Sequence, residues 1–295
     1  MKVRLMLLAT CTAGKAADTS AGEEMRYPRG VSMPPAQPAF FLSDGDRFVA
    51  TESTRGPWSR DYQHGGPPAA LLTRALEQLS GDGLLLTRVT FDFVRPVPIA
   101  TLAVRAETVR AGTKVRRLQA VLTTADGSPL VQASAVALRT APVLPATLGD
   151  EGAAPMSADH SAPFQFEFFP DAIGYHTAME TRIASGTWGK GPVAGWMRPR
   201  VPLVEGEAIS PLQRLMTAVD SASGLAVVLE PAHYTFVNAD LTVAIHRAPE
   251  GDWIGLDAAT VAEAHGIGLT RARLWDQRGA LGVSLQCCLA ESRRP

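Results

Sequence analysis

The stretch SPLQRLMTAVDSASG, residues 210–224, has the features of a helix that packs on a core and carries one acid. Ser210 can accept a backbone amide proton, Pro211 suits the first helical position, and Gln213 completes the spacing of a capping box. Apolar residues then recur at helical spacing: Leu212, Leu215, Met216 and Val219. Asp220 lies on the flank of this stripe, where a carboxylate is half shielded from water. The stretch therefore predicts a packed helix with an acid available for chemistry.

The first half of the chain repeats this pattern. Residues 68–79, which follow the sequence HGG at 64–66, predict a second helix with an apolar face and Gly81 as its stop. Each helix is followed by four strand-like segments, at 87–94, 102–109, 115–124 and 130–138, and again at 234–246, 253–261, 268–275 and 281–289. Further strands are expected at 47–52 and 175–183, and a loop at 186–202. Arg95 and Gly127 are 32 residues apart, as are Arg247 and Gly279, which indicates an internal duplication.

One helix followed by a meander of antiparallel strands predicts an α+β fold in which each sheet curls round its helix. We expect the two sheets to join edge to edge, because that arrangement covers two open edges. The predicted organisation is a disordered leader over 1–38, an N-terminal repeat over 39–140, a linker over 141–163 and a C-terminal repeat over 164–295.

Composition excludes several classes of protein. The chain has 295 residues, 46% of them hydrophobic, with a net charge of −1 and no block of Lys or Arg. The net charge is close to zero, so we expect neither nucleic acid nor an anionic membrane surface as a partner. Aromatic residues on which bases could stack are also few. The cysteines, Cys11, Cys287 and Cys288, fit a reducing compartment, and no metal-ligand spacing is visible. We expect no metal and no cofactor.

The N-terminal residues 1–16, MKVRLMLLATCTAGKA, have the outline of a secretory signal. The apolar run over 5–9 is too short for a good signal core and for spanning a bilayer. A disordered leader, or a true start at Met25 or Met33, is the favoured interpretation, and export is the alternative. We therefore expect a cytoplasmic protein without stable membrane insertion.

Four motifs carry a resemblance to a known family. They are HGGPPAALLTRAL at 64–76, FDFVRPVP at 91–98, FVNADLTVAIHRAPEGDWIGLD at 236–257 and GALGVSLQCCL at 279–289. In this order, and with the duplication, the chain resembles the double-hotdog acyl-CoA thioesterases of the thioesterase II (TesB-like) type from about residue 40 to 291. The resemblance implies a double hotdog fold, hydrolysis of acyl-CoA to free acid and CoA, and a homo-oligomer.

The resemblance also implies which residues carry the chemistry. In the family an Asp, a Thr or similar polar residue, and a Gln hold the water that attacks the thioester carbonyl; these positions fall on Asp220, Asn238 and Gln286. Asn238 departs from the family's hydroxyl, and Thr242 is the nearest hydroxyl on the same strand. In the first half Ala135 matches Gln286, and the helix carries Thr73 and Arg74 but no acid, so one site per chain is expected.

Substrate binding is predicted at His64, Gly65, Gly66 and Thr242. The two glycines allow a ligand to approach the backbone closely, and amides at a helix N-terminus favour a developing oxyanion. Arginines that could bind the CoA phosphates are Arg116, Arg117, Arg271 and Arg273.

Other functions stay open at this point. A double-hotdog protein that binds acyl-CoA or a lipid without turnover is compatible with the Asn238 departure. A hotdog hydratase would need an Asp–His pair near a helix entrance, and the second half offers no His there. A covalent nucleophile is not indicated, because the chain lacks a G-x-S-x-G elbow. Asp220, Gln286 and Asn238 each also have a purely structural interpretation, as a paired acid or as hydrogen-bonded core amides.

Overall fold

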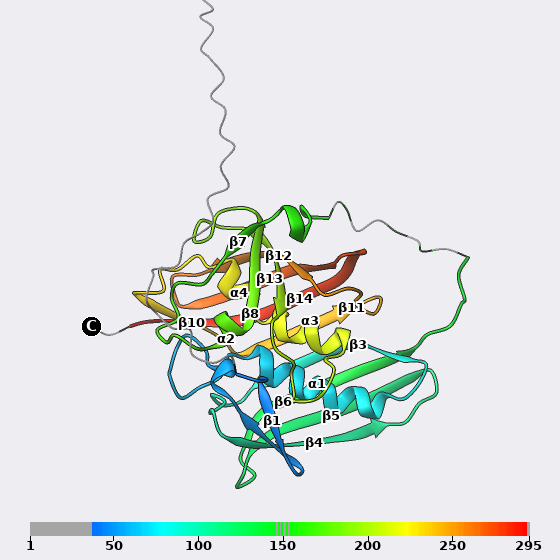
Figure 1. The fold of residues 1–295 in the computed structure, drawn as a ribbon. Helices are drawn as coiled ribbons and strands as arrows, with labels where there is room; N and C mark the ends of the chain where they lie inside the picture. The colour runs from blue at the N-terminus through cyan, green and yellow to red at the C-terminus, as the bar shows by residue number, and fades with distance from the viewer. Residues whose placement is uncertain (1–36, 146, 148, 150–151, 153, 294–295) are drawn as a thin grey trace, which may run out of the picture. The chain divides into compact units, whose positions relative to one another are not determined.

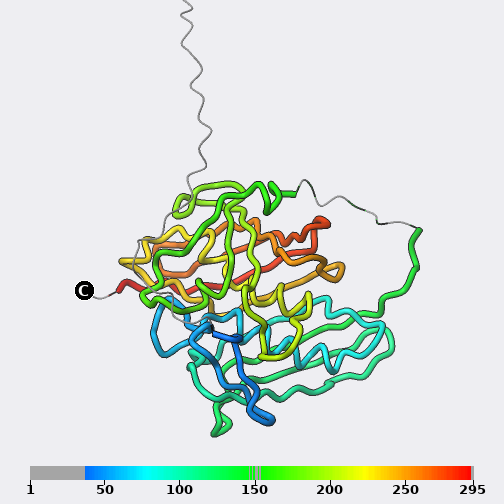
Figure 2. The backbone as a smooth tube through the Cα atoms, in the orientation of Figure 1, coloured from blue at the N-terminus to red at the C-terminus, as the bar shows by residue number. Residues whose placement is uncertain are grey.

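A sheet of 14 antiparallel strands runs through the described part of the chain, which comprises residues 37–145, 147, 149, 152 and 154–293 of the computed structural model. The predicted leader and Cys11 lie outside the described residues, apart from residues 37 and 38. Figure 2 shows that the blue-to-green chain of the first half and the yellow-to-red chain of the second half occupy different parts of the described unit.

The elements of the first half are β1 (Phe41–Asp44), β2 (Arg47–Ala50), the 3-10 turn η1 (Glu52–Thr54), α1 (Gly66–Ser80), β3 (Leu84–Phe93), β4 (Thr101–Arg110), β5 (Val115–Thr124) and β6 (Pro129–Arg139). Those of the second half are η2 (Ala158–His160), β7 (Ala162–Phe164), α2 (Tyr175–Ala178), β8 (Met179–Ser185), β9 (Val193–Pro199), α3 (Pro211–Val219), α4 (Ala222–Leu225), β10 (Tyr234–Asn238), β11 (Asp240–Ile245), β12 (Ile254–Ala262), β13 (Ile267–Asp276) and β14 (Gly279–Ser292). The strand order is β1-β2-β4-β5-β6-β3-β11-β14-β13-β12-β9-β8-β7, and β10 pairs with β14.

The two halves join where β3 pairs with β11, which confirms the predicted edge-to-edge junction (Figure 1). At the centre of this pairing Thr242 lies opposite Thr90, and the Thr242 hydroxyl donates to Thr90 Oγ1 at 3.1 Å. Thr242 follows Thr90 by 152 residues, the same spacing that relates Arg247 to Arg95. Equivalent residues of the two repeats therefore meet each other at an approximate two-fold axis.

Helix α1 is covered on both sides, because one side packs on β3 to β6 and the other on α3 (Figure 1). Leu72 and Leu76, on the predicted apolar face, are fully buried, and so are Ala69, Ala70 and Leu71. The two helices are in close contact at Gly66, where an added Cβ would lie 2.2 Å from the Thr217 carbonyl oxygen. Glycine at this position allows the backbones of the two repeats to touch.

Three expected elements differ from those observed. Residues 175–178 form helix α2 at the start of the predicted strand, because Tyr175 turns inward and its hydroxyl bonds the end of α3. The predicted loop over 186–202 contains β9, whose buried run Val193–Met197 pairs with both β8 and β12. The predicted strand over 234–246 is divided at Ala239 into β10 and β11.

The predicted helix over 210–224 is also divided. Ser210 and Gln213 form the expected capping box of α3, which ends at Val219 with Asp220 as its C-cap, and α4 follows. Asp220 is therefore at the end of the helix rather than on its flank. The first helix does carry an acid, contrary to expectation: Glu77 accepts hydrogen bonds from Ser210 Oγ and Gln213 Nε2 at 2.8 and 2.7 Å.

The predicted repeat boundaries at 140 and 164 stay a prediction. Cys287 is exposed and Cys288 buried, as expected for neighbours on one strand, and both are free thiols.

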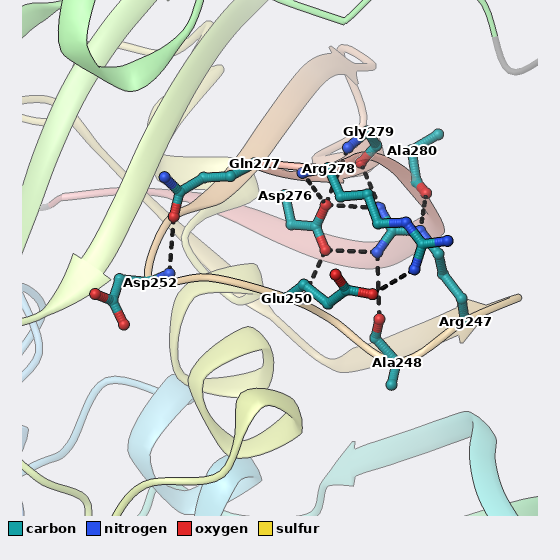
Figure 3. A network of polar contacts seen from close by, with 9 residues as sticks. All are labelled: Arg247, Ala248, Glu250, Asp252, Asp276, Gln277, Arg278, Gly279 and Ala280. Atoms are coloured by element: carbon teal, nitrogen blue, oxygen red, sulfur yellow. Dashed lines mark hydrogen bonds and ion pairs between the residues drawn. The ribbon is translucent and has the colours of Figure 1, made fainter.

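A buried ion pair closes the hairpin between β13 and β14 (Figure 3). Both Arg247 terminal nitrogens donate to the Asp276 carboxylate at 2.6 Å, and the backbone amides of Glu250, Arg278 and Gly279 donate to it as well. Burial raises the pKa of Asp276, but hydrogen bonds from Arg247 and these amides outweigh it, so the pKa lies below its usual value. Arg247 and Gly279, which mark the duplication in the second half, thus both belong to this network. We call the network around Asp276 the turn lock.

Replacing Gly66 tests the helix contact. Alanine is a better helix former than glycine by about 1 kcal/mol, so Gly66→Ala would stabilise α1 if its Cβ were free. We expect instead a loss of about 1–3 kcal/mol from overpacking against Thr217, measured by chemical denaturation. Gly224→Ala is the control, because its Cβ would meet only Phe168 at an ordinary 3.9 Å. Equal stability of the two variants would contradict the close contact.

Asp276→Asn tests the turn lock. At neutral pH we expect a loss of roughly 3 kcal/mol in the free energy of unfolding, because the half-buried Arg247 loses its fully buried counter-charge. Since the pKa of Asp276 is lowered by folding, its contribution is present above the unfolded pKa of about 4 and disappears as the pH falls through the lower folded value. The stability difference between variant and wild type should therefore shrink in acid. Asp257→Asn, which breaks a more exposed pair with Arg273, should cost under about 1 kcal/mol; a similar effect in both variants would argue against a buried lock.

Candidate active site

Three side chains from both repeats converge on one carboxylate. Asp220 ends α3 and is only 4% exposed. Asn238 ends β10 and donates from Nδ2 to Asp220 Oδ1 at 2.9 Å. Gln286 on β14 is fully buried and donates from Nε2 to the Asp220 carbonyl at 3.1 Å and to Oδ1 at 3.4 Å. His64, from the loop before α1, places Nδ1 3.1 Å from Asp220 Oδ2. Among the described residues, no Lys or Arg pairs with this carboxylate.

Asn238 is fixed by contacts at both ends of its amide. Its oxygen accepts from Ser223 Oγ at 2.9 Å and from Cys288 Sγ at 3.3 Å, so its nitrogen must face Asp220. Burial, together with the nearby Asp220 carboxylate, raises the pKa of the Cys288 thiol to about 12, although a hydrogen bond with Thr270 opposes the shift. Cys288 therefore stays a protonated donor. The Asn238 amide therefore has one fixed orientation toward the carboxylate, whereas a hydroxyl at this position could rotate.

His64 is held between Tyr175 and Asp220. Its ring stacks on the Tyr175 ring with centroids 3.7 Å apart and planes at 1°. The Tyr175 hydroxyl donates to the Thr217 carbonyl at 2.8 Å and lies 2.8 Å from Ser221 Oγ. Burial lowers the pKa of His64 more than the Asp220 carboxylate raises it. His64 is accordingly a neutral imidazole at neutral pH.

A cavity of about 370 Å³ opens above this group, and both repeats line it. His64, Gly65, Asp220 and Asn238 form part of its wall, whereas Gln286 lies behind them and does not reach the surface of the cavity. Most of the remaining wall is apolar and aromatic: Trp58, Phe93, Phe166, Phe168, Phe169 and Phe236. Such a cavity suits an apolar ligand that brings one polar group to the carboxylate.

The predicted substrate-binding residues divide into two groups. His64 and Gly65 line the cavity, and a Cβ on Gly65 would lie 2.7 Å from Asp220 Oδ2. Gly66 lies directly behind Gly65 and places its amide nitrogen 3.2 Å from His64 Nδ1. Thr242 is not brought to this group, because it occupies the centre of the β3–β11 junction.

Two of the predicted phosphate-binding arginines are committed elsewhere. Arg116 donates to the carbonyls of Leu79 and Ser80 and so caps the C-terminus of α1, and Arg273 pairs with Asp257. Arg95, which sequence reasoning considered only as a marker of the duplication, borders the cavity instead.

Sequence reasoning missed Tyr175, Ser223 and Cys288 as members of the site. Ser223 stands in the stretch that follows Asp220, so the sequence offers a signal for it. The pattern at Tyr175 predicts a strand, and the position of Cys288 bears only on disulfide pairing. The aromatic run over 164–169 was a further available signal, since its rings pack on one another beside the cavity.

Within the described residues, no group of His, Cys, Asp and Glu side chains has a geometry that could hold a metal ion. Among these residues no helix is long and apolar enough to cross a membrane. The site thus consists of a buried carboxylate, amide donors, a neutral imidazole and nearby helix-start amides. Chemically, the carboxylate can accept a proton from a water molecule in the cavity.

Comparison with protein-family models gives two matches in tandem. Residues 54–139 match the model of the acyl-CoA thioesterase N-terminal domain, and residues 150–290 match that of the acyl-CoA thioesterase C-terminal domain. A search of curated protein sequences gave no match.

Solved structures share the fold. A candidate thioesterase II from Thermobifida fusca aligns with a TM-score of 0.67 at 17% identity, over 89% of this chain and 100% of that one. A hot dog fold protein from Alicyclobacillus acidocaldarius aligns at 0.64 and 19% identity, over 86% and 96% of the two chains. The acyl-CoA thioesterase II TesB2 from Mycobacterium marinum aligns at 0.60 and 17% identity, over 85% and 94%. The predicted double hotdog fold is confirmed.

Proposed function

The chain belongs to the acyl-CoA thioesterase family and is a thioester hydrolase, and we propose that it hydrolyses acyl-CoA to free acid and CoA in the cavity above Asp220. The observation that carries the proposal is the buried Asp220 carboxylate, which faces an apolar cavity and is held by two side-chain amides. The acyl group would occupy the aromatic part of the cavity, and the thioester carbonyl would lie near the start of α1.

In the proposed reaction, Asp220 accepts a proton from a water molecule as the water oxygen attacks the thioester carbonyl carbon. The carbonyl oxygen becomes an oxyanion, which amides and the dipole at the N-terminus of α1 would stabilise. Collapse of this intermediate breaks the C–S bond, and the departing thiolate takes up the proton that Asp220 accepted from water, which gives free CoA and returns the carboxylate. The products are the carboxylic acid and the thiol, so no covalent enzyme intermediate is needed.

Asn238 and Gln286 assist by holding Asp220. Both amides donate toward Oδ1, and hydrogen bonds to the charged form favour it. We propose that this is how the chain works with an amide where the family has a hydroxyl: Asn238, fixed by Ser223, orients the carboxylate rather than rotating to follow the water. Binding of acyl-CoA at His64 and Gly65 is part of the same proposal, and Gly66 contributes through its backbone amide. The homo-oligomer and the cytoplasmic location stay predictions.

Asp220→Asn tests the proposal with little change of shape. We expect kcat/KM to fall by at least about 100-fold, since a positioned general base contributes about 10²–10⁴. Free thiol is followed with a thiol reagent over acyl-CoAs of increasing chain length. Asp257→Asn serves as the control. It removes a carboxylate of β12 that lies away from the cavity, so turnover should stay at the wild-type level. Wild-type turnover in Asp220→Asn would refute the role of Asp220, and tight binding by wild type without thiol release would favour an acyl-CoA-binding protein.

One observation favours a second activity. A hotdog hydratase requires an Asp–His pair at a helix entrance, and here His64 of the first repeat meets Asp220 of the second at 3.1 Å. Addition of water to an enoyl thioester would remove the conjugated double bond without releasing thiol. We expect hydrolysis to predominate with an enoyl-CoA, because the amide pair supports the charged carboxylate as base. Ultraviolet absorbance of the conjugated thioester and thiol release, recorded together, decide this: absorbance lost ahead of thiol would establish hydration instead.

A further inference from the structure

We propose that His64 is a positioning residue for Asp220, donating from Nδ1–H to Oδ2 and so fixing the plane of the carboxylate from the other repeat. The inference rests on the proposed hydrolysis and assigns His64 a task different from lining the substrate pocket. It also means that the first repeat, which sequence comparison leaves chemically empty, completes the site of the second.

The contacts of Nδ1 select one tautomer. The Gly66 amide nitrogen lies 3.2 Å away and Asp220 Oδ2 3.1 Å away. An unprotonated Nδ1 could accept from the amide, but its lone pair would then face a carboxylate. A protonated Nδ1 bonds the carboxylate instead, and the Gly66 N–H, which is directed at Nδ1, then gives up its hydrogen bond to that nitrogen. With no Lys or Arg pairing with Asp220 among the described residues, the Nδ1–H tautomer is the form that supports an ionised Asp220.

The ring is held in the plane that this bond requires. The Tyr175 ring covers one face of His64 at 3.7 Å, and Tyr175 is anchored to Thr217 in the last turn of α3. Gly65, next in the chain, has no side chain that could separate the imidazole from the carboxylate; a Cβ there would meet Asp220 Oδ2 at 2.7 Å. The end of α3 therefore carries both the carboxylate and the support for its donor.

With His64 included, Asp220 is held at both oxygens. Asn238 and Gln286 bond Oδ1 and His64 bonds Oδ2. The titratable groups that face the carboxylate are His64, Tyr175 and Cys288; burial lowers the pKa of His64 and raises those of Tyr175 and Cys288, so all three are uncharged at neutral pH. Loss of the His64 donor should thus remove the hydrogen bond that fixes the plane of the carboxylate at Oδ2 and lower kcat, without adding or removing a charge beside Asp220.

Two substitutions separate the donor from the ring. His64→Phe keeps an aromatic ring against Tyr175 without a donor, and His64→Asn keeps a donor near the position of Nδ1 without the ring. We expect His64→Phe to lower kcat by about 10–100-fold, the value of one hydrogen bond to a charged group. KM should change little. His64→Asn should recover much of kcat. His176→Phe, at a half-buried histidine outside the cavity wall, is the matched control.

The outcomes are distinguishable. Wild-type kcat in His64→Phe would overturn the proposal whatever the effect on KM, because an effect on KM alone indicates only a contact with substrate. Loss of kcat in His64→Asn together with wild-type kcat in His64→Phe would assign the ring stack rather than the donor. Nitrogen NMR of wild-type protein labelled at histidine gives a readout independent of activity and of variant folding: a His64 ring protonated at Nε2 alone would refute the bond to Asp220. Failure of wild type to release thiol would refute the proposed hydrolysis, while NMR would still test the His64 contact.

Discussion

The contact between the start of α1 and the end of α3 is the constraint on which the site depends. Gly66 packs on the Thr217 carbonyl and Gly65 on the Asp220 carboxylate, with distances that exclude even a methyl group. This contact places a helix N-terminus from one repeat against an acid at a helix C-terminus of the other. A carboxylate there is disfavoured by its own helix dipole but favoured by that of α1. The favourable helix dipole thus comes from the opposite repeat.

The stabilisation of Asp220 relies on neutral donors rather than on a cation. A guanidinium partner would hold the carboxylate ionised, but it would compete for the lone pairs that must accept a proton. Amides and an imidazole support the negative charge without placing a positive charge beside it. The ion pair between Arg247 and Asp276 illustrates the contrast, because there a bidentate arginine and three backbone amides saturate a carboxylate that only closes a turn.

Much of the fold could be predicted because it depends on local periodicity repeated twice. Two helix-and-sheet repeats could be predicted from three features of the sequence. These are the apolar stripe of α3, its capping box, and the equal spacing of Arg95–Gly127 and Arg247–Gly279. Strand β9 was missed because its glycine and tryptophan resemble loop composition, and its burial depends on pairing with strands far away in sequence. The convergence of Asp220, Asn238 and Gln286 followed from the family resemblance. The His64 contact could not be predicted, because it depends on the approach of two backbones 156 residues apart.

Glu77 shows what the duplication made possible. The antiparallel pair α1 and α3 has two ends, and at the end opposite Asp220 the capping box of α3 is tied to Glu77 by Ser210 and Gln213. Two separate identical subunits would have to keep both ends alike, since every residue of one would recur in the other. In a fused chain each end can acquire its own residues. The end at Glu77 can therefore hold the two helices in register. The end at Asp220 can carry the residues proposed for turnover.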